Sequence, residues 1–250
     1  MWDTYLIIPM TNVLLFIYDL IGHNFGIAII LFTILIRVIT FPLTAQQLKG
    51  TQGMQELQKD KEWLAIQKKY KNDKEKLASE QMRIYKERGI NPFGSCLPTL
   101  IQLPIIIGLY RAIITSLAAT PLALLNLSRN LYPFLDVSKI IPLNSHFLWM
   151  DLGRPESIDI FGFAFPTLAL IVVITSYIQS KLMTPPANPG DQSAAMGNMM
   201  AIYMPFLMGY FAMTFASGLA LYFIVSNLLG IAQYAMMGKA NWSNLIPARK

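Results

Sequence analysis

A run of 40 consecutive residues without one charged side chain, at 199–238, constrains this chain more than any other feature. About 20 mostly apolar residues cross a bilayer as one helix, so this run is long enough for two crossings. The composition agrees, because 54% of the residues are hydrophobic, 14% are charged and the mean hydropathy is +0.44. A soluble domain carries about 25% charged residues. The sequence therefore predicts an all-α polytopic membrane protein and excludes a soluble enzyme.

The apolar sequence divides into five segments of span length, separated by polar or charged stretches. The predicted transmembrane helices are 24–45, 95–118, 161–183, 199–216 and 218–238. The connecting segments are a helical hairpin at 46–92, an extracytoplasmic segment at 119–160, a cytoplasmic loop at 184–198 and a cytoplasmic tail at 239–250. Lys and Arg concentrate in the hairpin, near the loop and in the tail, and basic loops stay in the cytoplasm. We therefore expect the N-terminus outside and the C-terminus inside.

Residues 1–23 are apolar but interrupted. Pro9, Asn12 and Asp19 fall within 4–21, a stretch otherwise long enough to cross the membrane. We expect a helix that lies along the outer membrane interface, as amphipathic helices do. A sixth transmembrane helix is the alternative interpretation.

The segment 46–90 differs in character from the rest of the chain, with 11 of the 20 Lys and Arg and 7 of the 14 Asp and Glu. Its apolar residues recur at helical spacing on either side of a turn near 71–73. They are Leu57, Trp63, Leu64, Ile66 and Tyr70 before the turn, and Leu77, Ile84 and Tyr85 after it. This pattern predicts a cytoplasmic αα-hairpin, which either meets incoming chains and targeting factors or is a passive, solvated element.

The residues that usually carry metal or covalent chemistry are scarce. A single cysteine, Cys96, excludes an internal disulfide and a cysteine-based metal cluster. His23 and His146 are 123 positions apart and lie in no ligand-spaced motif, and nucleotide-binding and hydrolase motifs are missing from the sequence. We expect no metal, no cofactor and no enzymatic activity. The net charge of +6 arises mostly in the hairpin and indicates a membrane-facing surface rather than nucleic-acid binding.

Arg37 is the most unusual residue, because it lies near the middle of an apolar helix. An arginine there costs about 2.5–3.5 kcal/mol on insertion scales. Thr33, Thr40 and Thr44 follow the same helical face. Two interpretations remain open: a water-exposed cavity within the membrane, or an arginine that extends toward the inner interface.

Uncharged polar residues in the other spans could share such a cavity. Gln102, with Thr99, lies in the second predicted span, and Gln179 and Ser180 end the third. The fifth contains Ser226, Asn227 and Gln233. Alone, each is more typical of a helix–helix contact. Together with Arg37 they could line a hydrophilic pocket. The predicted spans hold no acidic residue, so a proton- or sodium-coupled transporter is disfavoured and Arg37 has no carboxylate to pair with.

Three motifs and the charged hairpin resemble a known family. The motifs are NFGIAIILFTILIRVITFPLT at 24–44, GINPFGSCLPTLIQLPIIIGLYRAI at 89–113 and SGLALYFIVSNLLGIAQ at 217–233. In this order, over nearly the whole chain, they resemble the YidC/Oxa/Alb family of membrane protein insertases, in its short bacterial form. The resemblance implies a five-helix core preceded by an interfacial helix, with a hydrophilic groove open to the cytoplasm and to lipid.

The resemblance also implies roles for individual residues. Arg37 would be the positive charge of the groove, with Thr33 beside it. Gln102, Gln179 and Asn227 would line the groove. Tyr222 and Phe223 would form an aromatic pair that contacts the substrate as it slides between the third and fifth helices.

By the same resemblance, the chain would insert nascent membrane proteins, help them fold and release their apolar segments to lipid in the bacterial plasma (inner) membrane. Its partners would be those nascent proteins and the bilayer, with the Sec translocon, the ribosome and the signal recognition particle receptor as further candidates. Two rival classes are a small channel or transporter and a membrane-complex assembly factor without its own groove.

Overall fold

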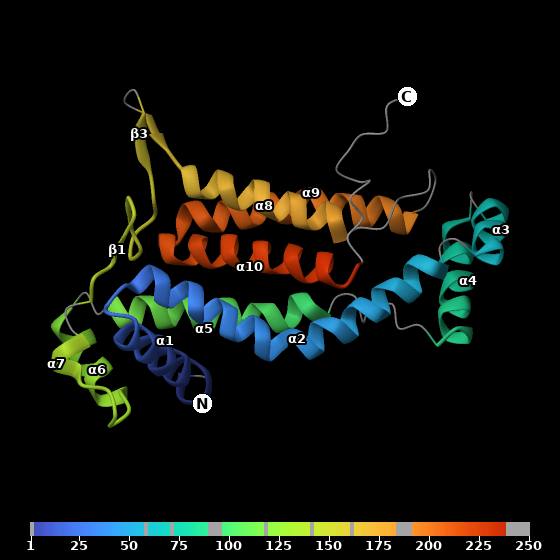
Figure 1. Ribbon diagram of the computed structural model, residues 1–250. Coiled ribbons are helices and arrows are strands. Elements are labelled where there is room, and N and C mark those ends of the chain that lie inside the picture. The colour runs from blue at the N-terminus through green and yellow to red at the C-terminus, as the bar shows by residue number, and fades with distance from the viewer. Residues whose placement is uncertain are drawn as a thin grey trace.

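The computed structural model describes residues 3–57, 60–70, 73–89, 97–117, 120–140, 143–160, 163–183 and 192–238. This part of the chain is mostly helical, with two small β-hairpins at one end (Figure 1). Cys96, most of the predicted loop at 184–198 and the whole predicted tail at 239–250 lie outside the described residues.

Five long helices form the body of the molecule. They are α2 (Phe25–Leu57), α5 (Leu97–Leu117), α8 (Thr167–Met183), α9 (Gln192–Thr214) and α10 (Ser217–Met236). Helix α10 is central, since it contacts the other four (Figure 1). Every residue from 217 to 223 is buried, which suits a stretch that is mostly apolar on all sides.

Two helices are long and apolar enough to cross a membrane by themselves, over Phe25–Ala45 and Ser217–Met236. A third candidate is a bent pair, Gln102–Leu117 with α6 (Pro121–Asn130), at an angle of 116°. Helix α8 has 17 residues, about 25 Å at 1.5 Å per residue, which is less than the roughly 30 Å hydrocarbon core. Length and composition thus identify two or three spans among the described residues, where the sequence predicted five.

The outer faces of these helices are apolar. Large hydrophobic side chains are exposed on α2, α8 and α9, among them Val38, Ile39, Ile174, Tyr203, Phe206 and Tyr210. Water-soluble monomers rarely expose apolar surface on this scale. The described surface is therefore suited to contact with lipid.

Helix α1 (Ile8–Leu20) follows a short π-helical turn, η1 (Asp3–Ile7), and packs against α2 and α5. Its inner face buries Leu14, Leu15 and Tyr18 completely. A Cβ at Gly108 of α5 would lie 2.6 Å from the sulfur of Met10, so the absence of a side chain at Gly108 permits the close approach. The outer face exposes apolar side chains such as Leu20.

The charged segment forms its own small helical pair, α3 (Lys61–Lys69) and α4 (Lys74–Glu87), at the far end of α2 (Figure 1). Its core is separate from the main one and contains Leu57, Trp63, Ile66, Leu77, Ile84 and Tyr85. An ion pair of 2.8 Å between Asp60, just before α3, and Arg88, just after α4, also joins the two helices. Helix α2 continues to Leu57, past the predicted boundary at 45, because 46–57 contains no proline, and Gly50 and Gly53 weaken a helix without ending it.

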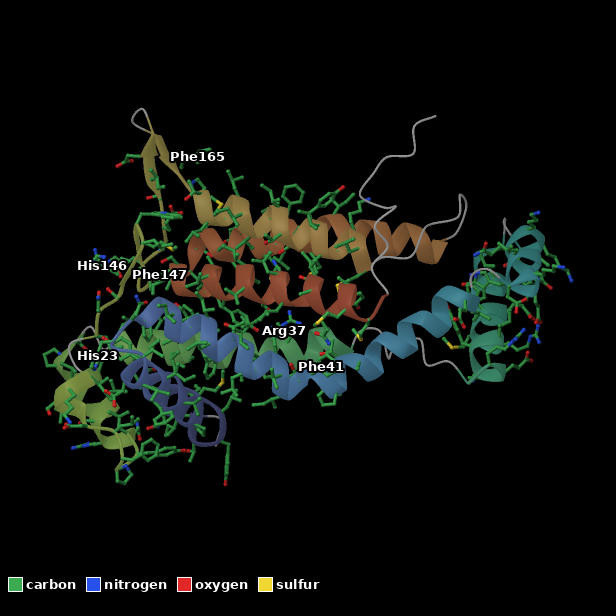
Figure 2. All side chains as sticks on the ribbon, in the orientation of Figure 1. His23, Arg37, Phe41, His146, Phe147 and Phe165 are labelled. Carbon is green, nitrogen blue, oxygen red and sulfur yellow. The ribbon has the colours of Figure 1, made fainter. Side chains whose placement is uncertain are left out.

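The opposite end contains α6, α7 (Val137–Ile140) and two antiparallel hairpins that the sequence analysis did not predict. Strand β1 (His146–Phe147) pairs with β2 (Met150–Asp151), and β3 (Ile158–Ile160) pairs with β4 (Phe163–Phe165). Phe147 packs against Gly26 at the start of α2, where a Cβ would lie 2.1 Å from the ring (Figure 2).

The segment after β2 caps the buried N-terminus of α10. The Ser217 N–H donates to the carbonyl of Arg154 at 2.8 Å, and the Gly218 N–H donates to that of Leu152 at 3.1 Å. The Ser217 hydroxyl donates to the carbonyl of Asp151 at 2.7 Å. Helix N-termini leave several N–H groups without partners inside the helix. Here the loop supplies those partners and fixes the position of α10.

Candidate functional site at Arg37

Arg37 lies between α2 and α10, in the span-length part of α2 (Figure 2). Its Nε donates to the Ser226 hydroxyl at 3.1 Å. Its Nη2 donates to the same hydroxyl at 2.6 Å and to the Ser226 carbonyl at 2.7 Å. Within the described ranges no carboxylate pairs with Arg37, so its partner is neutral and the positive charge is not compensated.

The third nitrogen of the guanidinium, Nη1, has a different environment. Among the described residues it has no hydrogen-bond partner, and it is not one of the buried polar atoms that lack a partner. Arg37 as a whole is half-buried rather than buried. Arginine has five N–H donors and cannot be deprotonated in proteins. One edge of the guanidinium is held by α10, and the other can receive a further acceptor.

Gly230, one turn after Ser226, makes room for this arrangement. A Cβ at Gly230 would lie 2.4 Å from Nε2 of Gln179 and 3.5 Å from Nη2 of Arg37. The missing side chain thus lets Gln179 from α8 approach the turn of α10 that Arg37 from α2 also contacts. We call Arg37, Gln179, Ser226 and Gly230 the Arg37 cluster.

Gln102 reaches the neighbouring turn of α10. Its Nε2 donates to the hydroxyl of Tyr222. Tyr222 and Ser226 are four residues apart and so share one face of the helix. The predicted residues Gln102, Gln179 and Arg37 therefore approach α10 from three helices along one polar strip.

Thr33 and Asn227 lie elsewhere. Thr33 is 1% exposed, and its hydroxyl donates to the carbonyl of Ile29 at 2.6 Å within α2. The Asn227 amide donates to the hydroxyls of Ser176 at 2.7 Å and Thr175 at 3.1 Å. Asn227 thus joins α10 to α8, and neither residue hydrogen-bonds to Arg37.

Tyr222 and Phe223 are both buried, with 2% and 5% of their surface exposed. Their ring centroids lie 5.8 Å apart within the main hydrophobic core. Neighbouring helical residues point about 100° apart, but α10 is surrounded, so both directions meet protein. In this structure neither ring faces a lipid-side surface.

The sequence analysis counted Ser226 among the polar residues of the fifth span but did not single it out as the partner of Arg37, and it did not consider Gly230. One signal was available, because small residues four apart in a membrane helix allow close contact between helices. Ser226 and Gly230 form such a pair in the motif SNLLG. Their specific relation to Arg37 required the packing of α2 against α10.

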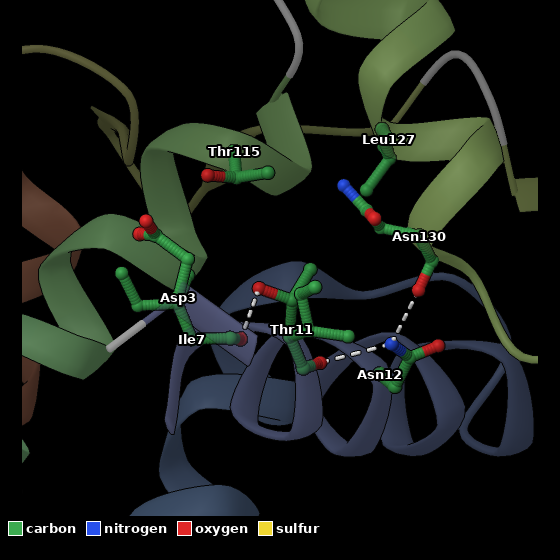
Figure 3. Close-up of a pocket in the computed structure, with 8 residues that line it drawn as sticks. Asp3, Ile7, Thr11, Asn12, Thr115, Leu127 and Asn130 are labelled. Carbon is green, nitrogen blue, oxygen red and sulfur yellow. Dashed lines mark hydrogen bonds between the residues drawn. The ribbon is translucent and has the colours of Figure 1, made fainter. Parts of the chain in front are cut away.

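A separate cavity of about 160 Å³ lies between η1, α1, α5 and α6 (Figure 3). Asp3, Thr11, Thr115 and Asn130 contribute to its polar lining. Asn12, at its edge, donates to the Asn130 carbonyl at 2.9 Å and accepts from the Tyr132 N–H at 2.7 Å. This polar residue, which interrupts an apolar sequence, therefore fastens α1 to the end of α6.

Metal-binding groups do not gather in the part of the chain that is described: no three His, Cys, Asp or Glu side chains there could hold one ion. His23 instead lies 3.4 Å from Asp19, one turn earlier, and packs edge-on against Tyr18.

The sequence model of the 60Kd inner membrane protein family matches residues 16–243. The chain belongs to this family. It is 34% identical over 235 residues to the membrane protein insertase MisCA of Bacillus subtilis, which covers 93% of this chain and 77% of that protein. It is 37% identical over 217 residues to the membrane protein insertase YidC of Fusobacterium nucleatum, with 86% and 87% covered.

The fold is similar to that of a solved member of the family. The crystal structure of an active YidC insertase with its first transmembrane domain resolved matches at a TM-score of 0.55 and 28% identity. The match covers 88% of this chain and 43% of the other. The resemblance to the YidC/Oxa/Alb insertases stated from the sequence motifs is thereby confirmed. Family membership and the span-length helices make this chain a bacterial inner-membrane protein.

Proposed function

We propose that this chain is a membrane protein insertase in which Arg37 receives the hydrophilic part of a nascent protein. The observation that carries the proposal is the half-occupied guanidinium of Arg37. It is held on one edge by Ser226, lacks a carboxylate partner among the described residues and is half-buried, with no hydrogen bond from Nη1 to those residues. The names of the relatives support the same activity.

The proposed membrane arrangement has five spanning helices, α2, α5, α8, α9 and α10, with α1 at the outer interface. The basic pair α3–α4 would lie in the cytoplasm, as the positive-inside rule requires. The β-hairpins, at the other end of the body, would then lie outside (Figure 1). The N-terminus would lie outside and the C-terminus inside. Arg37 would be at membrane depth, in a hydrophilic groove that it shares with Gln102 and Gln179.

The chemistry of this site is electrostatic. At an effective dielectric constant near 20, one close contact between Arg37 and a substrate carboxylate is worth about 4 kcal/mol before desolvation. Such a contact would hold an acidic tail transiently. The apolar part of the substrate would supply the driving force by entering lipid, at about −0.3 to −0.6 kcal/mol for each Leu-like residue. No covalent step, cofactor or nucleotide is needed.

The apolar part would leave between α8 and α10, past Tyr222 and Phe223. Because both rings are buried, this path requires the two helices to separate. The hydrogen bonds from Asn227 to Ser176 and Thr175 join the helices along this line. Interhelical hydrogen bonds in membranes contribute only about 0.6 kcal/mol on average, so they could open and close during insertion.

The α3–α4 pair would meet incoming chains or targeting factors. It has its own hydrophobic core and lies at the end of α2 away from the β-hairpins (Figure 1). A partner could therefore bind it without disturbing the membrane helices. Nascent membrane proteins and lipid are the primary partners in this proposal. The Sec translocon, the ribosome and the signal recognition particle receptor would act at this end.

Reconstitution of the purified protein into protein-free liposomes tests the function. An insertase should insert a small single-span protein on its own, measured by protection of the translocated tail from added protease. A channel or transporter would instead release a trapped ion or solute and leave the substrate exposed. An assembly factor without its own groove would do neither.

A further inference from the structure

All three hydrogen bonds that hold Arg37 in place are accepted by one residue. Ser226 is 4% exposed, and it accepts hydrogen bonds from Arg37 through its hydroxyl and through its main-chain carbonyl. A side chain that only had to be shielded from lipid could use any polar neighbour. Here two of its three nitrogens converge on a single turn of α10.

It is unusual that the main-chain carbonyl of Ser226 accepts a hydrogen bond from the side chain of Arg37. Within an α-helix, a carbonyl normally accepts from the N–H four residues later, which for Ser226 is that of Gly230. A second donor must approach from the side. Gly230 lies beside that donor: a Cβ there would be in ordinary contact with Nη2 of Arg37 at 3.5 Å and would meet Nε2 of Gln179 at 2.4 Å. Ser226 and Gly230 together form a docking place for the guanidinium.

We propose that Ser226 is a latch that holds Arg37 against α10 when no substrate is present, and that an acidic group of the substrate releases it. This inference rests on the proposed function and adds a positioning residue to it. The hydroxyl and carbonyl of Ser226 are neutral acceptors. A carboxylate carries a full negative charge and forms stronger hydrogen bonds with a guanidinium. An acidic tail can therefore displace Ser226, whereas water or a neutral tail exchanges with it poorly.

The latch also lies next to the contact between α8 and α10. Asn227, the following residue, donates to Ser176 and Thr175 of α8. Consecutive helical residues point about 100° apart, so α10 contacts α2 through one residue and α8 through the next. A rotation of α10 that follows the release of Arg37 would displace Asn227 as well. Recognition of an acidic tail would thus loosen the path by which the apolar segment leaves.

The test is the preference for acidic over neutral tails. The full-length protein in nanodiscs is titrated with two fluorescent single-span peptides whose tails carry four Asp or four Asn residues. Ser226→Ala removes the competing hydroxyl, and we expect it to tighten binding of the Asp peptide about fivefold, with the Asn peptide unchanged. Ser226→Thr keeps the hydroxyl and should retain the wild-type ratio.

A matched control is Ser116→Ala. Ser116 is fully buried on α5, and its hydroxyl has no hydrogen-bond partner among the described residues. Its removal should leave both affinities unchanged. A general loosening of the helices by loss of a buried serine would appear in this variant too.

The outcomes separate the latch from the proposed function. An unchanged or reduced Asp preference in Ser226→Ala, with that preference abolished in Arg37→Ala, overturns the latch and leaves the electrostatic function standing. An Asp preference that survives Arg37→Ala overturns the proposed role of Arg37. Equal weakening of both peptides in Ser226→Ala would assign Ser226 a structural role and also overturn the latch.

Discussion

Arg37 on α2 and Ser226 on α10 are joined by three hydrogen bonds, although 189 positions separate them in the sequence. The contact fixes a positive charge in the span-length part of α2 with a neutral partner. No hydrogen bond joins Nη1 to the described residues, so the charge is positioned without being neutralised. The proposed function and the latch both depend on this incomplete pairing.

The charge of Arg37 should matter more than the geometry of its guanidinium. We expect Arg37→Ala to lower insertion of substrates with acidic tails at least about tenfold, because a contact of about 4 kcal/mol before desolvation is lost. Arg37→Lys should retain much of the activity, since a moving chain offers no fixed bidentate partner. Insertion rates in proteoliposomes, at matched protein amounts, measure both. Normal insertion of acidic tails by Arg37→Ala would favour an arginine that merely extends toward the interface.

Weakening the contact between α8 and α10 should expose the aromatic pair to substrate. Photo-crosslinkers at 222 and 223 should capture a stalled nascent chain, and Asn227→Ala should increase the yield because two interhelical hydrogen bonds are lost. A crosslinker at Tyr18, which is buried on α1, is the control and should capture nothing. Capture on α2 alone would rule out a path past Tyr222 and Phe223.

Gly230 should tolerate a methyl group only if Gln179 moves. Gly230→Ala places a Cβ 2.4 Å from Nε2 of Gln179 and should destabilise the protein by about 1–3 kcal/mol, the usual cost of overpacking. Gln179→Ala in the same chain should recover most of that loss, because the two groups compete for one space. Thermal unfolding in detergent of the wild type, the two single variants and the double variant measures these changes in stability. If the two substitutions changed stability additively, the contact between residue 230 and Gln179 would not be tight.

The α3–α4 pair should fold and unfold independently of the membrane helices. Trp63 is 1% exposed in its separate core, and Trp63→Ala should cost that pair about 3–5 kcal/mol. Proteolysis should then cut between 60 and 89 while the helical body remains intact. The exposed Met82, changed to Ala, is the control.

Removing 50–86 altogether tests whether the α3–α4 pair acts in insertion. We expect the deletion to reduce insertion more than it reduces the stability of the membrane helices, because the pair has a core of its own. Stability is followed by thermal unfolding, and insertion by protease protection. Unchanged insertion of every substrate tried would leave the pair a passive element.

Properties that depend on short stretches of chain could be predicted from the sequence. The sequence identified a mostly helical chain with apolar segments of span length, because hydropathy is local. Arg37 was recognised as unusual from its apolar neighbours alone, and Gln179 was proposed beside it. The candidate span in α2 covers Phe25–Ala45 and the helix continues to Leu57, since the change to polar sequence at 46 marks a change of surroundings and does not end a helix.

The contacts that give these residues their environment were decided by the tertiary structure. Ser226 as the partner of Arg37, and the open side of Gly230, depend on how α2 and α8 pack on α10. Tyr222 and Phe223 are both buried because α10 is surrounded, which no periodicity within 217–236 reveals. The sequence by itself determined that a charge lies inside an apolar helix, because hydropathy is a property of neighbouring residues. Which atoms accept hydrogen bonds from Arg37 was decided only by packing, because its partner Ser226 lies 189 residues away in the sequence.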